Sequence, residues 1–246
     1  MSVETFIFVG AVFALAGLVK GVIGLGLPTI SMGLLAIVMP PIEAAALLIL
    51  PSLVTNVWQM LAGPALGIVA RRLLPMMIAV CLGTWAGLGF MTGTSARLGA
   101  ALLGGALAIY AVTGLAALRL RVPAAMEQVL GPLTGAVTGA ITAATGVFVI
   151  PAVPYLQAIG LEKEELVQAL GLSFTVSTAA LAVNVAAQGA LNVAVAATTL
   201  AALALACVGM WVGQAARLRL SPIAFRRWFF SGLLLLGLYL VARSVF

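Results

Sequence analysis

The chain has 246 residues, of which 64% are apolar and only 7% are charged. A soluble domain carries about 25% charged residues, so this composition excludes an ordinary water-exposed surface and predicts a chain embedded in a lipid bilayer. The formal net charge is +6, but the arginines are scattered between apolar stretches. That pattern favours loop charges that orient membrane helices over a nucleic-acid-binding surface, so we expect no nucleic-acid partner.

The long apolar stretches predict α-helices. A helix that crosses the hydrocarbon core needs about 20 apolar residues, and only helices or closed barrels satisfy backbone N–H and C=O groups in lipid. The stretches are rich in Ala, Leu and Gly and lack the alternation of strands. The sequence therefore predicts an all-α polytopic membrane protein. Because it has two cysteines and no histidine, we expect no disulfide framework, metal site or other cofactor.

A repeated motif indicates that the chain is duplicated. Residues 81–87 read C-x-G-x-W-x-G, and residues 207–213 read the same. Internal repetition of this kind decides the architecture of the whole fold. We predict a first repeat at 1–121 and a second repeat at 122–246.

Each repeat is predicted to begin with a broken helical hairpin, an apolar stretch interrupted by Gly and Pro, and to continue with three uninterrupted transmembrane helices. In the first repeat the hairpin lies at 5–41 and the helices at 44–62, 73–93 and 97–118. In the second repeat the hairpin lies at 128–161 and the helices at 165–187, 191–214 and 225–245. Trp85 and Trp211 fall in the middle of predicted helices, and we expect them in the protein core.

The positive charges indicate how the broken stretches are threaded. If each stretch crossed the membrane once, the charges would divide five against six between the two sides. If each enters and returns to the same side, only Arg97 and Arg243 lie opposite the other nine, which are Arg71, Arg72, Arg119, Arg121, Lys163, Arg217, Arg219, Arg226 and Arg227. Because cytoplasmic loops carry the excess of Lys and Arg, we expect the second arrangement. It makes the two repeats inverted, with both termini periplasmic.

Interrupted helices in inverted repeats are typical of secondary transporters, whose substrates bind near the midplane of the membrane. In the first break, Gly24 and Gly26 permit non-helical backbone, and Pro28, followed by Thr29, suits the first turn of a new half-helix. The candidate residues of the second break are Thr142, Thr145, Gly146 and Pro151. If both breaks converge, two half-helix N-termini face one cavity and favour an anion.

Lys20 is the basic residue that lies deepest inside an apolar stretch. A lysine at the centre of a membrane helix costs about 2.5–3.5 kcal/mol on insertion scales, so such residues are functional candidates. One interpretation is that Lys20 binds an anion. The alternative is that it ends a short half-helix and extends its ammonium group to water. Glu43 begins the next predicted helix and is a candidate partner for it in space.

Two pairs of amide side chains each share a helix face. They are Asn56 with Gln59, and Asn184 with Gln188. Amides can bind the oxygens of a sulfonate, a sulfite or a carboxylate, and they can also join helices by hydrogen bonds. The sequence leaves both roles open for these four residues.

The chain resembles the TauE/SafE family over nearly its whole length. The resemblance rests on a Gly-rich broken helix followed by Pro, on its repeat, and on the asparagine-bearing helix after each break; the residues are Gly21, Gly24, Gly26, Pro28, Gly139, Gly146, Pro151, Asn56 and Asn184. It implies an exporter of sulfite or organosulfonates in a bacterial inner membrane. The second break departs from the pattern, because Thr142, Ala143 and Ala144 occupy positions where glycines are expected.

We therefore expect a secondary transporter that exports sulfite or an organosulfonate, such as sulfoacetate or taurine, by alternating access. Its partners would be the small anion and the lipid bilayer, and a homodimer is left open. An anion channel and a non-transporting scaffold subunit are the alternatives. An enzyme is not expected, because the chain has no His or Asp to serve as a general base or metal ligand.

Overall fold

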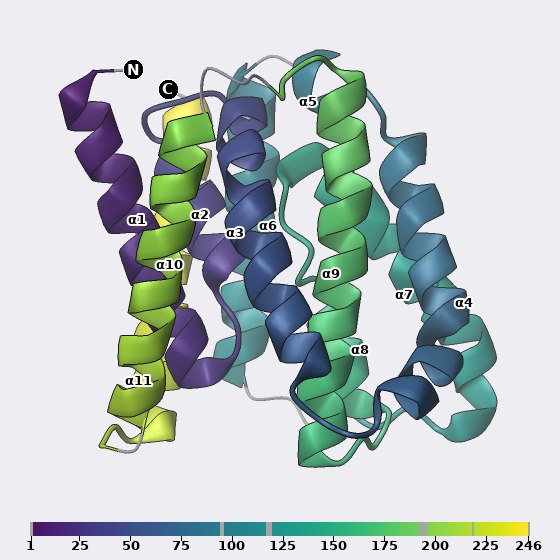
Figure 1. The fold of residues 1–246 in the computed structure, drawn as a ribbon. Coiled ribbons are helices and arrows are strands. Elements are labelled where there is room, and N and C mark those ends of the chain that lie inside the picture. The colour runs from purple at the N-terminus through teal and green to yellow at the C-terminus, as the bar shows by residue number, and fades with distance from the viewer. Residues whose placement is uncertain (1, 94–95, 117–119, 192–195, 218, 246) are drawn as a thin grey trace.

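The computed structural model describes residues 2–245 apart from 94–95, 117–119, 192–195 and 218. All regular structure in these residues is helical, and seven helices are long and apolar enough to span a bilayer (Figure 1). This confirms the prediction of an all-α polytopic membrane protein. The helices are α1 (Val3–Ile23), α2 (Leu27–Leu35), α3 (Pro41–Leu61), α4 (Leu66–Ala86), α5 (Phe90–Gly93), α6 (Ala96–Ala116), α7 (Ala124–Thr145), α8 (Ala152–Ala158), α9 (Lys163–Ala187), α10 (Ala196–Arg217) and α11 (Pro222–Val245).

Each half of the chain begins with a helix that stops at a glycine and is followed by a shorter helix. α1 ends at Gly24, which has a φ of 75° and donates its N–H back to the last turn. Gly26 has a φ of 110° and precedes α2, whose first turn contains Pro28. Glycine adopts such left-handed angles without a steric penalty, so these residues let the chain reverse direction. In the second half, α7 likewise ends at Gly146 in the left-handed conformation, and α8 follows.

Glycines bring α10 against α1 and α4 against α7 with their backbones in contact. A Cβ atom added to Gly209 would lie 2.1 Å from the carbonyl oxygen of Ala14, and one added to Gly83 would lie 2.3 Å from the carbonyl oxygen of Ala136. Both glycines belong to the repeated C-x-G-x-W-x-G motif. The motif therefore marks the faces on which two helices of different halves approach most closely, as small residues do in membrane proteins.

The tryptophans of the same motif lie on the outside of the bundle. Trp85 is 43% exposed and Trp211 is 72% exposed, so the expectation that they belong to the core was wrong. Each lies two residues after the close-contact glycine, which is about 200° around the helix. When the glycine faces the neighbouring helix, the tryptophan must face away from it, toward the surface that lipid would cover.

The corresponding helices α3 and α9 pack against each other in opposite directions. Gly171 of α9 lies against Met60 of α3. Thr178 lies two turns after Gly171 on α9, and it is hydrogen bonded to Ser52, which lies two turns before Met60 on α3. The helices α6 and α11 also pair. This pairing supports an inverted relation between the repeats, which stays a prediction.

Both chain termini lie at the same end of the bundle (Figure 1). At the opposite end α3, α6, α8 and α10 end, and α4, α7, α9 and α11 begin. That opposite end carries Arg71, Arg72, Arg121, Lys163, Arg217, Arg219, Arg226 and Arg227, whereas Arg97 and Arg243 belong to the end with the termini. Arg119 lies outside the described residues. The described basic residues therefore divide between the two ends of the bundle as in the second threading, in which each broken stretch enters the membrane and returns to the same side.

Among the predicted helices, the one at 73–93 differs most from the structure in its bounds. Instead of a helix at 73–93, α4 spans Leu66–Ala86, and the short α5 spans Phe90–Gly93. The prediction placed Arg71 and Arg72 before the start of the helix, but both lie within the first two turns of α4. The predicted helices 97–118 and 191–214 extend into 117–119 and 192–195, which lie outside the described residues.

Candidate functional site

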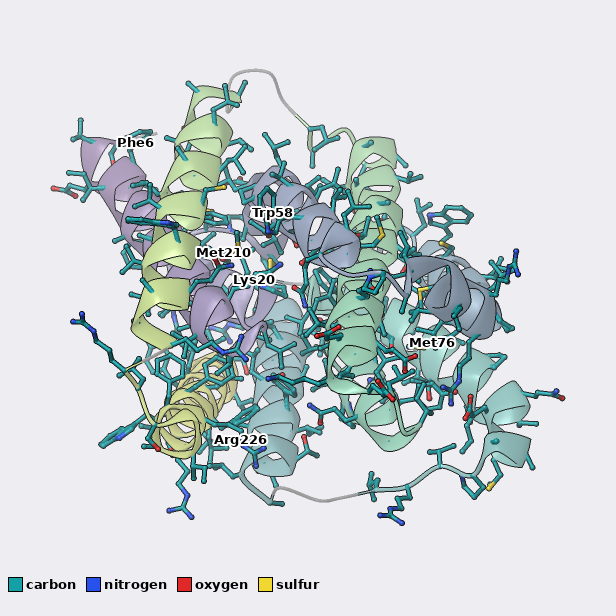
Figure 2. The ribbon with its side chains drawn as sticks, turned by 60° about the horizontal axis from the view of Figure 1, so that its bottom comes forward. Phe6, Lys20, Trp58, Met76, Met210 and Arg226 are labelled. Atoms are coloured by element: carbon teal, nitrogen blue, oxygen red, sulfur yellow. The ribbon has the colours of Figure 1, made fainter. Side chains whose placement is uncertain are left out.

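Lys20 is buried at the end of α1, with only 4% of its surface exposed. Its Nζ donates to Thr55 Oγ1 at 3.0 Å and also to Asn56 Oδ1, both on α3. Figure 2 shows Lys20 within the bundle. The ammonium group is thus held inside the bundle, so the alternative that Lys20 extends it to water is wrong. Glu43 does not pair with it, because the ion pair found among the described residues joins Arg72 to Glu127.

The partners of Lys20 continue into a buried polar network between α3 and α9. Asn56 Nδ2 donates to Ser52 Oγ at 3.0 Å and to Thr178 Oγ1 at 3.4 Å, and the two hydroxyls are 3.2 Å apart. None of these side chains is more than 4% exposed. We call Lys20, Ser52, Thr55, Asn56 and Thr178 the lysine cluster. It contains one cationic group and no acidic group.

Gln59 and Gly24 border the lysine cluster. Gln59 lies one turn beyond Asn56 on α3 and donates from Nε2 to the carbonyl oxygen of Val167 at 3.2 Å, while its Oε1 is buried without a hydrogen-bond partner. A Cβ atom on Gly24 would lie 3.9 Å from Gln59 Nε2. The break after α1 therefore lies beside the side-chain amide of Gln59.

The two breaks meet at α2. Pro28 and Thr29 are buried in its first turn, and Thr29 Oγ1 donates to the carbonyl oxygen of Gly26 at 3.0 Å. Further along α2, Met32 packs against the second break, because a Cβ atom on Gly146 would lie 2.7 Å from Met32 Cε. The second break thus reaches the first half of the chain through α2.

The hydroxyls of the second break hydrogen bond to their own helix. Thr142 Oγ1 donates to the carbonyl oxygen of Thr138 at 2.7 Å, and Thr145 Oγ1 donates to that of Ile141 at 2.7 Å. Pro151 lies at the start of α8. Within the described residues, no hydrogen bond joins Thr142, Thr145 or Pro151 to the lysine cluster. Their part in a shared site with Lys20 stays a prediction.

The second amide pair is separate from the first. Asn184 Nδ2 donates to the carbonyl oxygen of Thr84 at 3.0 Å, and Gln188 Nε2 donates to the Asn184 backbone carbonyl at 3.2 Å and to Asn184 Oδ1. Asn184 lies six residues beyond Thr178 on α9, which is about 9 Å along a helix. Thus Asn56 lies at the contact between α3 and α9, whereas Asn184 lies farther along α9 and contacts α4.

The predicted site did not include three members of the lysine cluster, Ser52, Thr55 and Thr178. Ser52 carried a signal, because it lies four residues before Asn56 and seven before Gln59 and therefore shares their helix face. Thr55 and Thr178 carried none, since their roles depend on how α1 and α9 approach α3.

Gln168 is another buried amide that the sequence did not mark. Its Nε2 donates to the carbonyl oxygens of Met60 at 3.0 Å and Gly63 at 2.6 Å, and its Oε1 accepts from the Ala65 N–H at 2.8 Å. It satisfies the backbone of the α3–α4 turn, which is a structural role.

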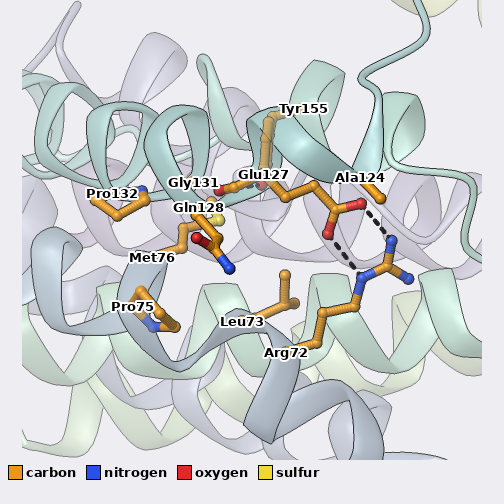
Figure 3. A pocket seen from close by; sticks show the side chains of 10 residues that line it. All are labelled: Arg72, Leu73, Pro75, Met76, Ala124, Glu127, Gln128, Gly131, Pro132 and Tyr155. Atoms are coloured by element: carbon orange, nitrogen blue, oxygen red, sulfur yellow. Dashed lines mark hydrogen bonds and ion pairs between the residues drawn. The ribbon is translucent and has the colours of Figure 1, made fainter.

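A separate cavity of about 220 Å³ lies between α4, α7 and α8 (Figure 3). Arg72 forms a two-pronged ion pair with Glu127 there, with N–O distances of 2.7 and 2.9 Å, and donates to the carbonyl oxygen of Ile159 at 2.8 Å. None of the predicted site residues lines this cavity. Arg72 joins α4 of the first half to α7 and to the end of α8 in the second.

Replacing Arg72 with glutamine is expected to lower the free energy of unfolding by about 1 kcal/mol, because partly exposed ion pairs contribute on that order. For a chain of this size the melting temperature should fall by about 2–4 °C. Arg71→Gln, one residue earlier, removes the same charge from an exposed side chain and serves as the control. Equal melting temperatures for the two variants would show that the ion pair contributes nothing.

Comparison with protein families agrees with this architecture. The model of the family described as sulfite exporter TauE/SafE matches residues 9–240. No curated protein and no solved structure matches the chain. The match covers both broken segments, the lysine cluster and the second amide pair. The chain therefore belongs to the sulfite exporter TauE/SafE family.

Proposed function

We propose that the chain exports sulfite or an organosulfonate across the bacterial inner membrane, and that Lys20 binds the anion. The observation that carries the proposal is the burial of a lysine whose hydrogen-bond partners, Thr55 and Asn56, are neutral oxygens. Burying an unpaired charge is costly, and ionisable groups inside the membrane mark substrate pathways. An anion beside Nζ would provide the missing negative charge.

The cluster also offers suitable chemistry for the oxygens of such an anion. An ammonium group has three N–H donors, and Lys20 uses two of them in its hydrogen bonds to Thr55 and Asn56. The third donor is left for a sulfite or sulfonate oxygen. Gln59 and the backbone near Gly24 border the place where that oxygen would lie.

The burial of the cluster supports a carrier over an open channel. Asn56, Ser52 and Thr178 are 1% exposed or less, so a continuous water-filled path does not pass through them in this conformation. A carrier must open this region to one side at a time. We propose alternating access, with Asn184 and Gln188, farther along α9, as a second polar binding place for the anion.

Membrane potential is sufficient to drive export. An inside-negative potential moves an anion outward with about 2.3 kcal/mol per charge for each 100 mV. The chain contains no Asp, and we propose uniport without a carboxylate proton relay. The arginine-rich end would face the cytoplasm, which places both termini in the periplasm.

A ligand screen tests this proposal. The purified protein would be heated with sulfite, sulfate, thiosulfate, taurine, sulfoacetate and simple carboxylates. A bound anion at 100 times its dissociation constant stabilises the folded state by about 2.7 kcal/mol, so sulfite or a sulfonate should raise the melting temperature by several degrees. The proposal fails if none of the sulfur anions raises it more than chloride does at the same ionic strength.

A further inference from the structure

A groove of about 550 Å³ lies at the start of α11, at the arginine-rich end of the bundle. It is lined by Ser221, Ile223, Ala224, Arg227, Trp228 and Ser231. The groove thus combines a guanidinium group and two hydroxyls with apolar side chains. It has no residue in common with the lysine cluster and plays no part in the proposed transport.

Positive charge surrounds this groove without compensation. Arg217, Arg219 and Arg226 are exposed, as is Arg227 in the groove itself. The sequence has no acidic residue after Glu165, and within the described part of the chain these arginines form no ion pair. Figure 2 shows Arg226 at this end of α11. The groove therefore has a strongly electropositive surrounding that attracts phosphate groups.

An apolar stripe continues from the groove along α11. Trp228 is 79% exposed, Leu235 is 70% exposed and Leu238 is 53% exposed. Their spacing of seven and three residues places them on one helix face. The stripe leads from the arginine-rich end toward the middle of the bundle, where the hydrocarbon core of the bilayer would lie.

We propose that this groove binds the headgroup of an anionic phospholipid. The lipid phosphate would accept hydrogen bonds from Arg227 and from the hydroxyl of Ser231, which lies one helical turn later, and one acyl chain would lie along the stripe. A soluble phosphate would use only the charged part of this surface. The continuity of the groove with Trp228 and Leu235 therefore favours a lipid.

The test compares phosphatidylglycerol with phosphatidylcholine on the purified full-length protein, by native mass spectrometry. Arg227→Gln should weaken phosphatidylglycerol binding about fivefold, since one arginine near a membrane surface contributes about 1 kcal/mol. Ser231→Leu fills the groove, keeps every charge and should weaken binding similarly. Arg121→Gln removes an exposed charge from the same end of the bundle and should leave binding unchanged.

Two results would overturn the proposal. Equal weakening by Arg121→Gln and Arg227→Gln would mean that diffuse charge attracts the lipid. Equal binding of glycerol phosphate and phosphatidylglycerol would mean that the groove is a site for soluble anions. Melting temperatures without added lipid would verify that each variant is folded.

Discussion

Replacing Lys20 with methionine is expected to reduce anion transport in proteoliposomes by at least about a hundredfold. Removing one partner of a buried charge pair costs about 3–5 kcal/mol, and each 1.4 kcal/mol is a factor of ten in binding. The protein should nevertheless fold, because methionine has a similar shape and removes a charge that has no acidic partner in the cluster. We expect its melting temperature to equal or exceed that of the wild type.

The chain offers a matched control, since its second lysine, Lys163, is exposed at the start of α9. Lys163→Met makes the same chemical change and should leave the flux within about twofold of the wild type, because it changes only a solvent-exposed charge. Wild-type flux through Lys20→Met would exclude Lys20 from the anion site. A pronounced loss of melting temperature in that variant would instead assign Lys20 a structural role.

Gly209→Ala is expected to cause the largest loss of stability. The new Cβ would lie 2.1 Å from the Ala14 carbonyl oxygen and 2.9 Å from the Leu18 backbone nitrogen. Backbone atoms cannot move aside as a side-chain end can, so α1 and α10 would have to separate. Overpacking of this kind costs about 1–3 kcal/mol and occasionally more, and we expect a value at or above the upper limit. The melting temperature should fall by about 6–12 °C.

Gly105→Ala is the control for this variant. Gly105 is also in the interior of a helix, α6, but an added Cβ there would meet nothing within 4 Å. It should raise stability by about 0.5–1 kcal/mol, because alanine loses less backbone entropy than glycine in a helix. If both variants had the same melting temperature, the close approach of α10 to α1 would not be a determinant of stability.

The parts of the site that the sequence predicted are those encoded locally. Gly24, Gly26 and Pro28 interrupt a helix through their own backbone preferences, so the first break could be located without the fold. Lys20 was recognisable because its neighbours are apolar. Whether its ammonium group extends to water required the structure, because that depends on whether α3 offers acceptors at the level of Nζ.

Other features depended on the environment of the helices. Thr178 meets Asn56 because α3 and α9 cross there, and nothing in either segment encodes that position. Arg72 was predicted to precede its helix, whereas it lies within α4 and forms an ion pair with Glu127 of α7. Trp85 and Trp211 were placed inside because they lie in the middle of predicted helices, but a position along a helix does not determine which face it lies on.

The glycine contacts also determine which parts of the molecule can move as units. The four most extensive helix pairings, α1 with α10, α4 with α7, α6 with α11 and α3 with α9, each join one half of the chain to the other. The halves are therefore interlocked. A motion that keeps these contacts would move α1 and α2 with α10, and α7 and α8 with α4. The two predicted repeats and the groups of helices that pack together are thus different divisions of the same chain.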